Sequence, residues 1–135
     1  NSAIGALENT FLPGWVPQRE LDVLTKMSTV GLVATKDIPN FRMSIPNKVY
    51  DYLSHGIPIF SYLSGALKNL INKYDVGVIY DSNGLDSLYN ALENYFRNSQ
   101  IQKDQSKNAK LLYAKHFDGT KNYKKAIDKI TSVKL

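Results

Sequence analysis

Three polar residues, Lys48, Asp51 and His55, are spaced so that a helix would present them on one side. Their separations of three and then four residues correspond to neighbouring positions on a helical surface. A cation, a carboxylate and an imidazole near the positive end of a helix suit an anionic ligand that also carries hydroxyl groups. A nucleoside diphosphate has both properties. The same spacing also occurs on helix faces that only contact water, and the pattern alone leaves that alternative open.

The segment that carries these residues has clear helix boundaries. Pro46 fits the first turn, where its missing N–H costs nothing, and Gly56 can adopt the left-handed conformation just beyond the end. Val49 and Leu53 lie four residues apart and form the face that we expect to be buried. The sequence therefore predicts a helix over about 46–55.

The rest of the chain alternates short apolar runs with amphipathic segments. Continuous apolar, β-rich runs predict buried strands at 29–34, 57–63 and 76–80. Apolar residues at helical spacing predict further helices at 17–27, 64–74 and 85–97, and two more from 101 onward with a break near 117–119. Residues 35–45 are expected to form a polar loop.

Two of these helices have apolar faces that matter for the fold. The helix that begins at Pro17 is expected to bury Leu21, Leu24 and Met27. In the last helix Tyr123, Ile127 and Ile130 recur at i, i+4 and i+7.

This alternation predicts an α/β fold: a Rossmann-like, mostly parallel sheet with helices on both faces and a helical C-terminal tail. Such sheets bind ligands beyond the carboxyl ends of their strands. The loops expected at that edge are 14–17, 36–45, 64–65 and 81–84. We interpret residues 1–135 as a single domain, with residues 1–100 forming the α/β part and 101–135 the C-terminal helices.

Composition argues against several classes of protein. The absence of cysteine excludes disulfides, thiol nucleophiles and thiolate metal sites. No apolar run approaches the roughly 20 residues that cross a bilayer, and residues 1–5 do not resemble a signal peptide, so the cytosol is the expected compartment. His55 and His116 are the only histidines and few acids cluster, so we expect no metal. Motifs of hydrolases, dinucleotide dehydrogenases and P-loop NTPases are absent.

Positive charge is concentrated near the C-terminal end. Residues 103–134 hold nine lysines and three aspartates, whereas the whole chain carries a net charge of +5. This stretch contains no arginine, which argues against a nucleic-acid partner. Lysine-rich helices are attracted to anionic lipid, so these basic helices are a candidate contact with the inner-membrane surface. A lysine-rich helix face that only contacts water is the simpler alternative.

Two runs of residues resemble a known family: FLPGWV at 11–16 and SxPxKxxDYLxxGxPI at 44–59. Their order resembles the C-terminal domain of GT-B-fold glycosyltransferases (glycosyl transferases group 1, family 4-like), which build bacterial capsules and lipopolysaccharide. Gly65, the strand at 75–78 and the helix at 108–117 also resemble this family. The similarity covers nearly all of the chain after residue 9.

The resemblance implies a donor site for a nucleotide sugar. Gly14 and Val16 would line the base pocket through backbone groups, and Asp51 would bind the two ribose hydroxyls. Lys48 would neutralise the diphosphate. The remaining donor-binding residues implied by the family pattern are Ser44 and Asn47 at the helix N-terminus, and Gly65 in a loop that approaches the sugar or phosphate.

The resemblance further implies transfer of a sugar, with UDP as the expected nucleotide, to a growing, lipid-linked capsule or lipopolysaccharide glycan. No cofactor or metal is expected, and the enzyme would be cytoplasmic or peripheral at the inner membrane. The acceptor would bind to an N-terminal domain of the same protein. The pattern departs from the family at Met43, where many members carry an acid, and at Asp51, where glutamate is usual.

The family's complete domain begins with two further βα units, so the resemblance also implies a fragment that alone would not catalyse transfer. The sequence does not identify the catalytic residues. Two alternatives stay open: a non-catalytic α/β binding or regulatory module, and a nucleotide-sugar epimerase of GT-B architecture.

Overall fold

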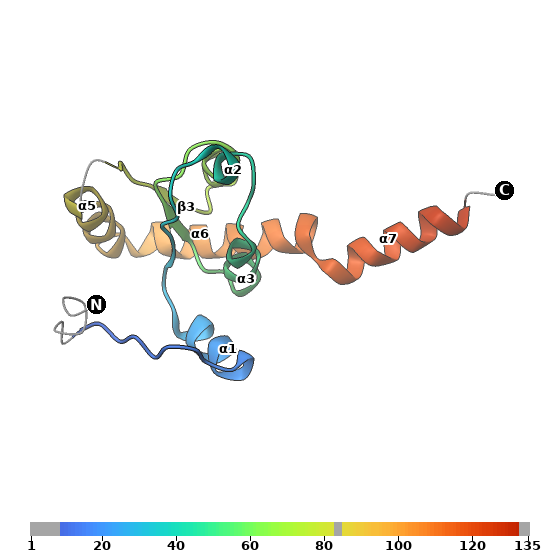
Figure 1. Ribbon diagram of the computed structural model, residues 1–135, viewed down its shortest axis with the longest axis horizontal. Helices are drawn as coiled ribbons and strands as arrows, with labels where there is room; N and C mark the ends of the chain where they lie inside the picture. Colours follow the sequence, from blue (N-terminus) through green and yellow to red (C-terminus); the bar gives the residue numbers. More distant parts are fainter. Residues whose placement is uncertain (1–8, 83–84, 133–135) are drawn as a thin grey trace.

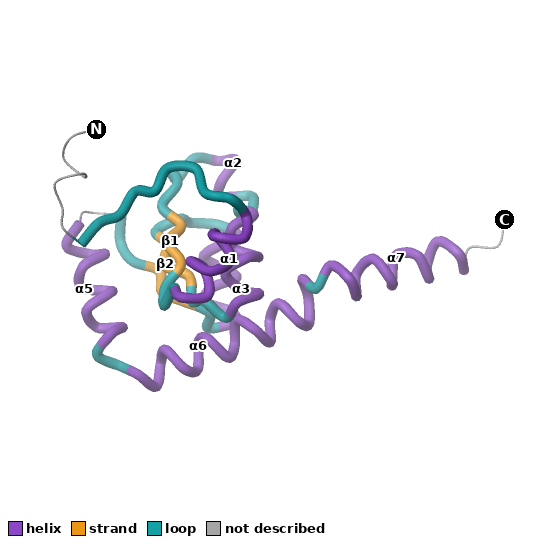
Figure 2. Tube along the Cα trace, turned by 90° about the horizontal axis from the view of Figure 1, so that it is seen from below, coloured by secondary structure: helices purple, strands orange, loops and turns teal. Residues whose placement is uncertain are grey.

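The computed structural model describes residues 9–82 and 85–132, and it shows a mixed α/β chain built on a parallel sheet of three strands (Figures 1 and 2). The strands are β1 (Gly31–Val33), β2 (Ile59–Ser61) and β3 (Gly77–Ile79). They lie in the order β1-β2-β3, with Ile59 opposite both Gly31 and Gly77. All three predicted strands are confirmed, although each is shorter than its apolar run.

Most of the described chain is helical. The helices are α1 (Gln18–Met27), α2 (Pro39–Arg42), α3 (Asn47–His55), α4 (Ala66–Tyr74), α5 (Leu85–Phe96), α6 (Ser99–Leu112) and α7 (Gly119–Ser132), with a π-helical turn, η2 (Tyr113–Phe117), after α6. The short helix α2 lies inside the segment predicted as a loop, so that prediction is wrong there. Pro39 starts the helix, and the N–H groups of Phe41 and Arg42 both donate to the Ile38 carbonyl at 3.0 Å.

The main core lies on one face of the sheet. It combines strand residues with the buried faces of α3, α4 and α6, and its members include Val33, Ile59, Val49, Leu53, Leu67, Leu70, Ile71, Ala109 and Leu112. The predicted buried face of α3 is therefore confirmed. Successive strand residues point to opposite faces, and Phe60 on the second face packs edge to face against Tyr95 of α5 at 5.0 Å between ring centroids.

Helices thus lie on both faces of the sheet, but the second face is covered unevenly. Leu32 of β1 remains 43% exposed there.

The predicted burial of α1 is wrong. Leu21 and Leu24 are each 43% exposed and Met27 is 77% exposed, and α1 has no buried residue. In Figure 1 the helix lies beside the sheet-containing body and an extended segment joins it to β1. Leu21 lies beside the polar residues that face α3, and Val23 and Leu24 line an open groove with the segment before α1, so the apolar residues of α1 are only partly covered in the described chain.

Helix α6 is fixed to the end of α4 and the start of β3 by side-chain amides. The buried Gln105 donates through Nε2 to Asp75 Oδ1 at 2.8 Å and to the Gly77 carbonyl at 3.0 Å. Asn108 Nδ2 donates to the Asp75 carbonyl at 3.1 Å. Burial raises the pKa of the nearby Tyr95 to about 12, and the charge of Asp75 adds to the effect.

Helix α7 leaves this body and extends away from it (Figures 1 and 2). The chain breaks at Asp118, whose backbone is extended and whose Oδ1 accepts a hydrogen bond from the Thr120 N–H at 3.1 Å. The predicted break near 117–119 is confirmed.

Candidate functional site

Helix α3 has the boundaries that its sequence predicts. Pro46 precedes the first helical residue, and Gly56 ends the helix in the left-handed conformation with a φ of 73°. Val49 and Leu53 are fully buried. The helix is therefore held from its apolar side, and its polar side is left to contact solvent or a ligand.

The polar side presents Lys48 and Asp51 as exposed residues. Within the part of the chain that the structure describes, neither side chain has a hydrogen bond or an ion pair. His55 differs, because its Nδ1 lies 2.9 Å from the Asp51 carbonyl oxygen and 2.9 Å from Ser54 Oγ. Lys48 and Asp51 are thus the two side chains of this helix face that are free to bind a charged ligand.

A cleft of about 110 Å³ separates the polar sides of α1 and α3. Its polar lining comes from Gln18, Asp22 and Thr25 of α1, and from Lys48, Asp51 and His55 of α3. Small-molecule sites usually enclose about 300–1,000 Å³, so this cleft has room for only part of a nucleotide.

The predicted base-pocket residues lie at the other side of α1. Gly14 and Val16 belong to the extended segment that leads into this helix, and Val16 lines an open groove of about 600 Å³ together with Trp15 and Arg19. Trp15 is 86% exposed, so its ring does not pack between buried elements. The groove and the cleft share α1 but no lining residue.

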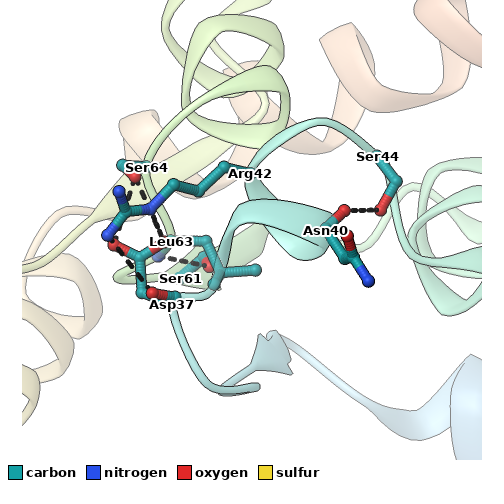
Figure 3. A network of polar contacts seen from close by, with 7 residues as sticks. All are labelled: Asp37, Asn40, Arg42, Ser44, Ser61, Leu63 and Ser64. Carbon is teal, nitrogen blue, oxygen red and sulfur yellow. Dashed lines mark hydrogen bonds and ion pairs between the residues drawn. The ribbon is translucent and has the colours of Figure 1, made fainter.

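A polar network holds the loop that enters α3 (Figure 3). The carboxylate of Asp37 accepts from Arg42 Nε at 3.0 Å and from Ser64 Oγ at 3.1 Å. The Arg42 guanidinium, aided by Ser64, holds the pKa of the Asp37 carboxyl below its ordinary value. This network ties the β1–α3 loop to the β2–α4 loop. Sequence reasoning missed it, because the contact between positions 37 and 64 leaves no local signal.

The two remaining predicted residues, Ser44 and Asn47, lie at the entrance to α3. Both are exposed, and Ser44 Oγ donates to the Asn40 carbonyl at 2.9 Å (Figure 3). Ser44 therefore closes a local turn, whereas Asn47 begins the helix.

Gly65 has a structural role of its own. Its φ is +79°, and a Cβ atom there would overlap the carbonyl group of Arg42. The close approach that glycine permits is therefore made to the chain's own backbone. The predicted approach to a ligand stays a prediction.

A second cavity, of about 390 Å³, lies at the carboxyl ends of β2 and β3. The rings of Tyr62 and Tyr80 meet there edge to face at 5.8 Å, beside Lys68. Asp37 and Ser64 of the polar network also line this cavity. The residues that follow two neighbouring strands thus meet at one edge of the sheet, which is where parallel sheets bind ligands.

Among residues 9–82 and 85–132, no three His, Cys, Asp or Glu side chains gather as a potential metal site. No family model, curated protein or solved structure matches this chain.

The Asp37 network makes stability depend on pH in a defined direction. A carboxyl group whose pKa is lowered by folding stabilises the protein above its unfolded pKa, and this contribution is lost as the pH falls through the folded value. We expect Asp37→Asn to be less stable than the wild type at pH 7, and we expect this difference to be smaller at about pH 2. Urea unfolding at both pH values measures this difference.

Asp51→Asn is the matched control, because the Asp51 carboxylate has no partner in the described chain. Its midpoint of urea unfolding should equal that of the wild type at both pH values. A constant difference between wild type and Asp37→Asn across this range would show that the ionised carboxylate does not stabilise the loop.

Proposed function

We propose that α3 binds the nucleotide of a nucleotide sugar, and that this chain is the donor-binding part of a GT-B-fold glycosyltransferase. One observation carries the proposal: Lys48 and Asp51 are exposed and without partners in the described chain, on a helix whose opposite face is fully buried. Because the buried residues fix the orientation of α3, the two charges are held in place without using them for folding.

The chemistry of each group matches one part of the ligand. A carboxylate accepts hydrogen bonds from both hydroxyls of a ribose, which suits Asp51. Lys48, nearly one turn closer to the N-terminus, would pair with the diphosphate. No side chain caps α3, so the N–H groups of Asn47 and Lys48 would also be available to phosphate oxygens, whereas that of Val49 donates to the Pro46 carbonyl at 2.9 Å. As the sugar leaves, the negative charge that develops on the diphosphate would meet these groups.

The remaining parts of the donor extend beyond the cleft. The base would reach the groove at Trp15 and Val16, next to Gly14 in the chain, where the exposed indole ring offers a stacking surface. The sugar would lie toward Ser44 and Gly65. Because the cleft between α1 and α3 is too small for a whole nucleotide, α1 would move outward. The absence of buried residues in α1 keeps the cost of this movement low.

The reaction class rests on the resemblance of segments 11–16 and 44–59 to the glycosyltransferase family. The transferred sugar would extend a capsule or lipopolysaccharide glycan that is linked to lipid. The acceptor would bind to an N-terminal domain of the same protein, and the transfer would need no metal. The parallel sheet, with its loops gathered at one edge, supports a ligand site of this kind.

An amide NMR titration of the whole chain with UDP, GDP and UMP tests the proposal. UDP should shift the resonances of 14–16, 44–51 and 64–66 at millimolar concentration. UMP lacks the second phosphate, so it should still shift 14–16 and Asp51 but shift Asn47 and Lys48 less.

Two results would contradict the proposal. One is the absence of shifts with every nucleotide at millimolar concentration. The other is a set of shifts confined to the lysine-rich helices α6 and α7, which would indicate attraction of phosphate to positive charge without a defined site.

A further inference from the structure

Helix α7 exposes an apolar stripe to solvent. Every residue of the helix is exposed, and the side chains of Tyr123, Ile127 and Ile130 are 76%, 58% and 73% exposed. Their i, i+4, i+7 spacing places them on one side of the helix. We call these three residues the α7 stripe. Three large apolar side chains on one exposed side of a helix indicate a surface that contacts a binding partner.

The helix has few contacts that would hold it against the rest of the chain. Lys121 Nζ donates to the Ala114 carbonyl at 3.3 Å, and Asn122 Nδ2 donates to the His116 carbonyl at 3.1 Å. Beyond Asn122, no hydrogen bond joins α7 to another described element. A helix of 14 residues is only marginally stable alone in water, so packing of its apolar side would stabilise it.

The charges of α7 indicate the chemistry of that partner. The helix carries Lys121, Lys124, Lys125 and Lys129 against the single acid Asp128. At 100° per residue, Lys124 and Lys129 lie on either side of the α7 stripe. An apolar stripe between lysines is the pattern of helices that lie in the surface of an anionic membrane.

We propose that α7 binds the surface of an anionic lipid membrane, with the α7 stripe in the interface and the lysines directed to lipid phosphates. Among the described residues, no helix is long and apolar enough to cross a membrane, so this contact would be with one leaflet. A second copy of the chain is a poorer occupant. Packing one stripe against another would bring the flanking lysines of both copies together.

Sedimentation of the full chain with vesicles tests this proposal. Vesicles of phosphatidylcholine with about 30% phosphatidylglycerol should bind the chain, and pure phosphatidylcholine should bind it far less. NaCl at about 0.5 M should release it, because salt screens the lysines.

The combined change Lys124→Gln with Lys129→Gln should weaken binding to the anionic vesicles about 30-fold, at about 1 kcal/mol for each lysine. Ile127→Ser with Ile130→Ser should weaken it about tenfold or more.

Two variants outside α7 are matched controls. Leu111→Ser changes a residue of α6 that is 58% exposed, as Ile127 is, and Lys26→Gln removes an exposed lysine of α1. Both should bind vesicles as the wild type does. The proposal is overturned if anionic vesicles do not bind the chain, or if the α7 variants bind as the controls do. It is also overturned if light scattering shows a dimer that Ile127→Ser dissociates.

Discussion

Replacing both Lys48 and Asp51 with alanine should weaken UDP binding by about 150-fold to 25,000-fold, while the fold stays intact. A hydrogen bond to a charged group contributes about 1.5–3 kcal/mol, and the two losses act on different parts of the ligand. Both side chains are exposed and without partners in the described chain, so their removal should change the free energy of unfolding by less than about 0.5 kcal/mol. Calorimetric titration and urea unfolding measure the two quantities.

The matched control is Asp104→Ala with Lys107→Ala. Asp104 and Lys107 are an exposed acid and an exposed base three positions apart on α6, the same separation as in α3, and Asp104 also accepts a hydrogen bond from Gln100 Nε2 at 3.0 Å. The control should bind UDP as the wild type does. Equal losses of UDP affinity in both variants would show that UDP is attracted to surface charge in general. This result would contradict a binding site on α3.

Replacing Leu53 with alanine should lower the free energy of unfolding by about 2–5 kcal/mol. This is the opposite of the result expected for Lys48 and Asp51, whose removal should leave the stability of the fold nearly unchanged. Leu53 is fully buried and belongs to the core that joins α3 to the sheet, α4 and α6. Its truncation removes apolar contacts and leaves a cavity that the surrounding helices can fill only in part. The midpoint of urea unfolding, followed by circular dichroism at an unchanged m-value, gives this quantity.

Asp51→Ala on the same helix is the control for this loss, and it should unfold at the wild-type midpoint. If Asp51→Ala were the destabilised variant and Leu53→Ala were neutral, the helix would be held by its polar side. The proposed ligand site would then be a structural contact.

The position of α3 could be predicted because its signals are local. Pro46 and Gly56 mark the two ends of the helix, and the four-residue spacing of Val49 and Leu53 defines its buried face. Each signal lies within the helix or at the residue directly beside it. The three strands were found for the same reason, since a continuous apolar run of a few residues is the local mark of a buried parallel strand.

Features that depend on distant residues could not be predicted in this way. The apolar period of α1 shows that one side is apolar, but it does not say what covers that side, and in the structure Met27 remains exposed. The bond from Ser64 to Asp37 joins positions 27 residues apart, and the bond from Gln105 to Asp75 joins positions 30 apart. Helix α2 has only four residues, which is too short for its sequence to show a helical period.

The outer strands of the sheet affect how copies of this protein associate with one another. Within residues 9–82 and 85–132, β1 and β3 each pair along one side only, so both outer strands keep a row of peptide groups to which another chain could add. The net charge of +5 opposes that encounter. This repulsion reaches about 30 Å at 0.01 M salt but only about 8 Å at 0.15 M. We therefore expect the colloidal stability of the chain to be greatest in dilute buffer and to fall as salt is added.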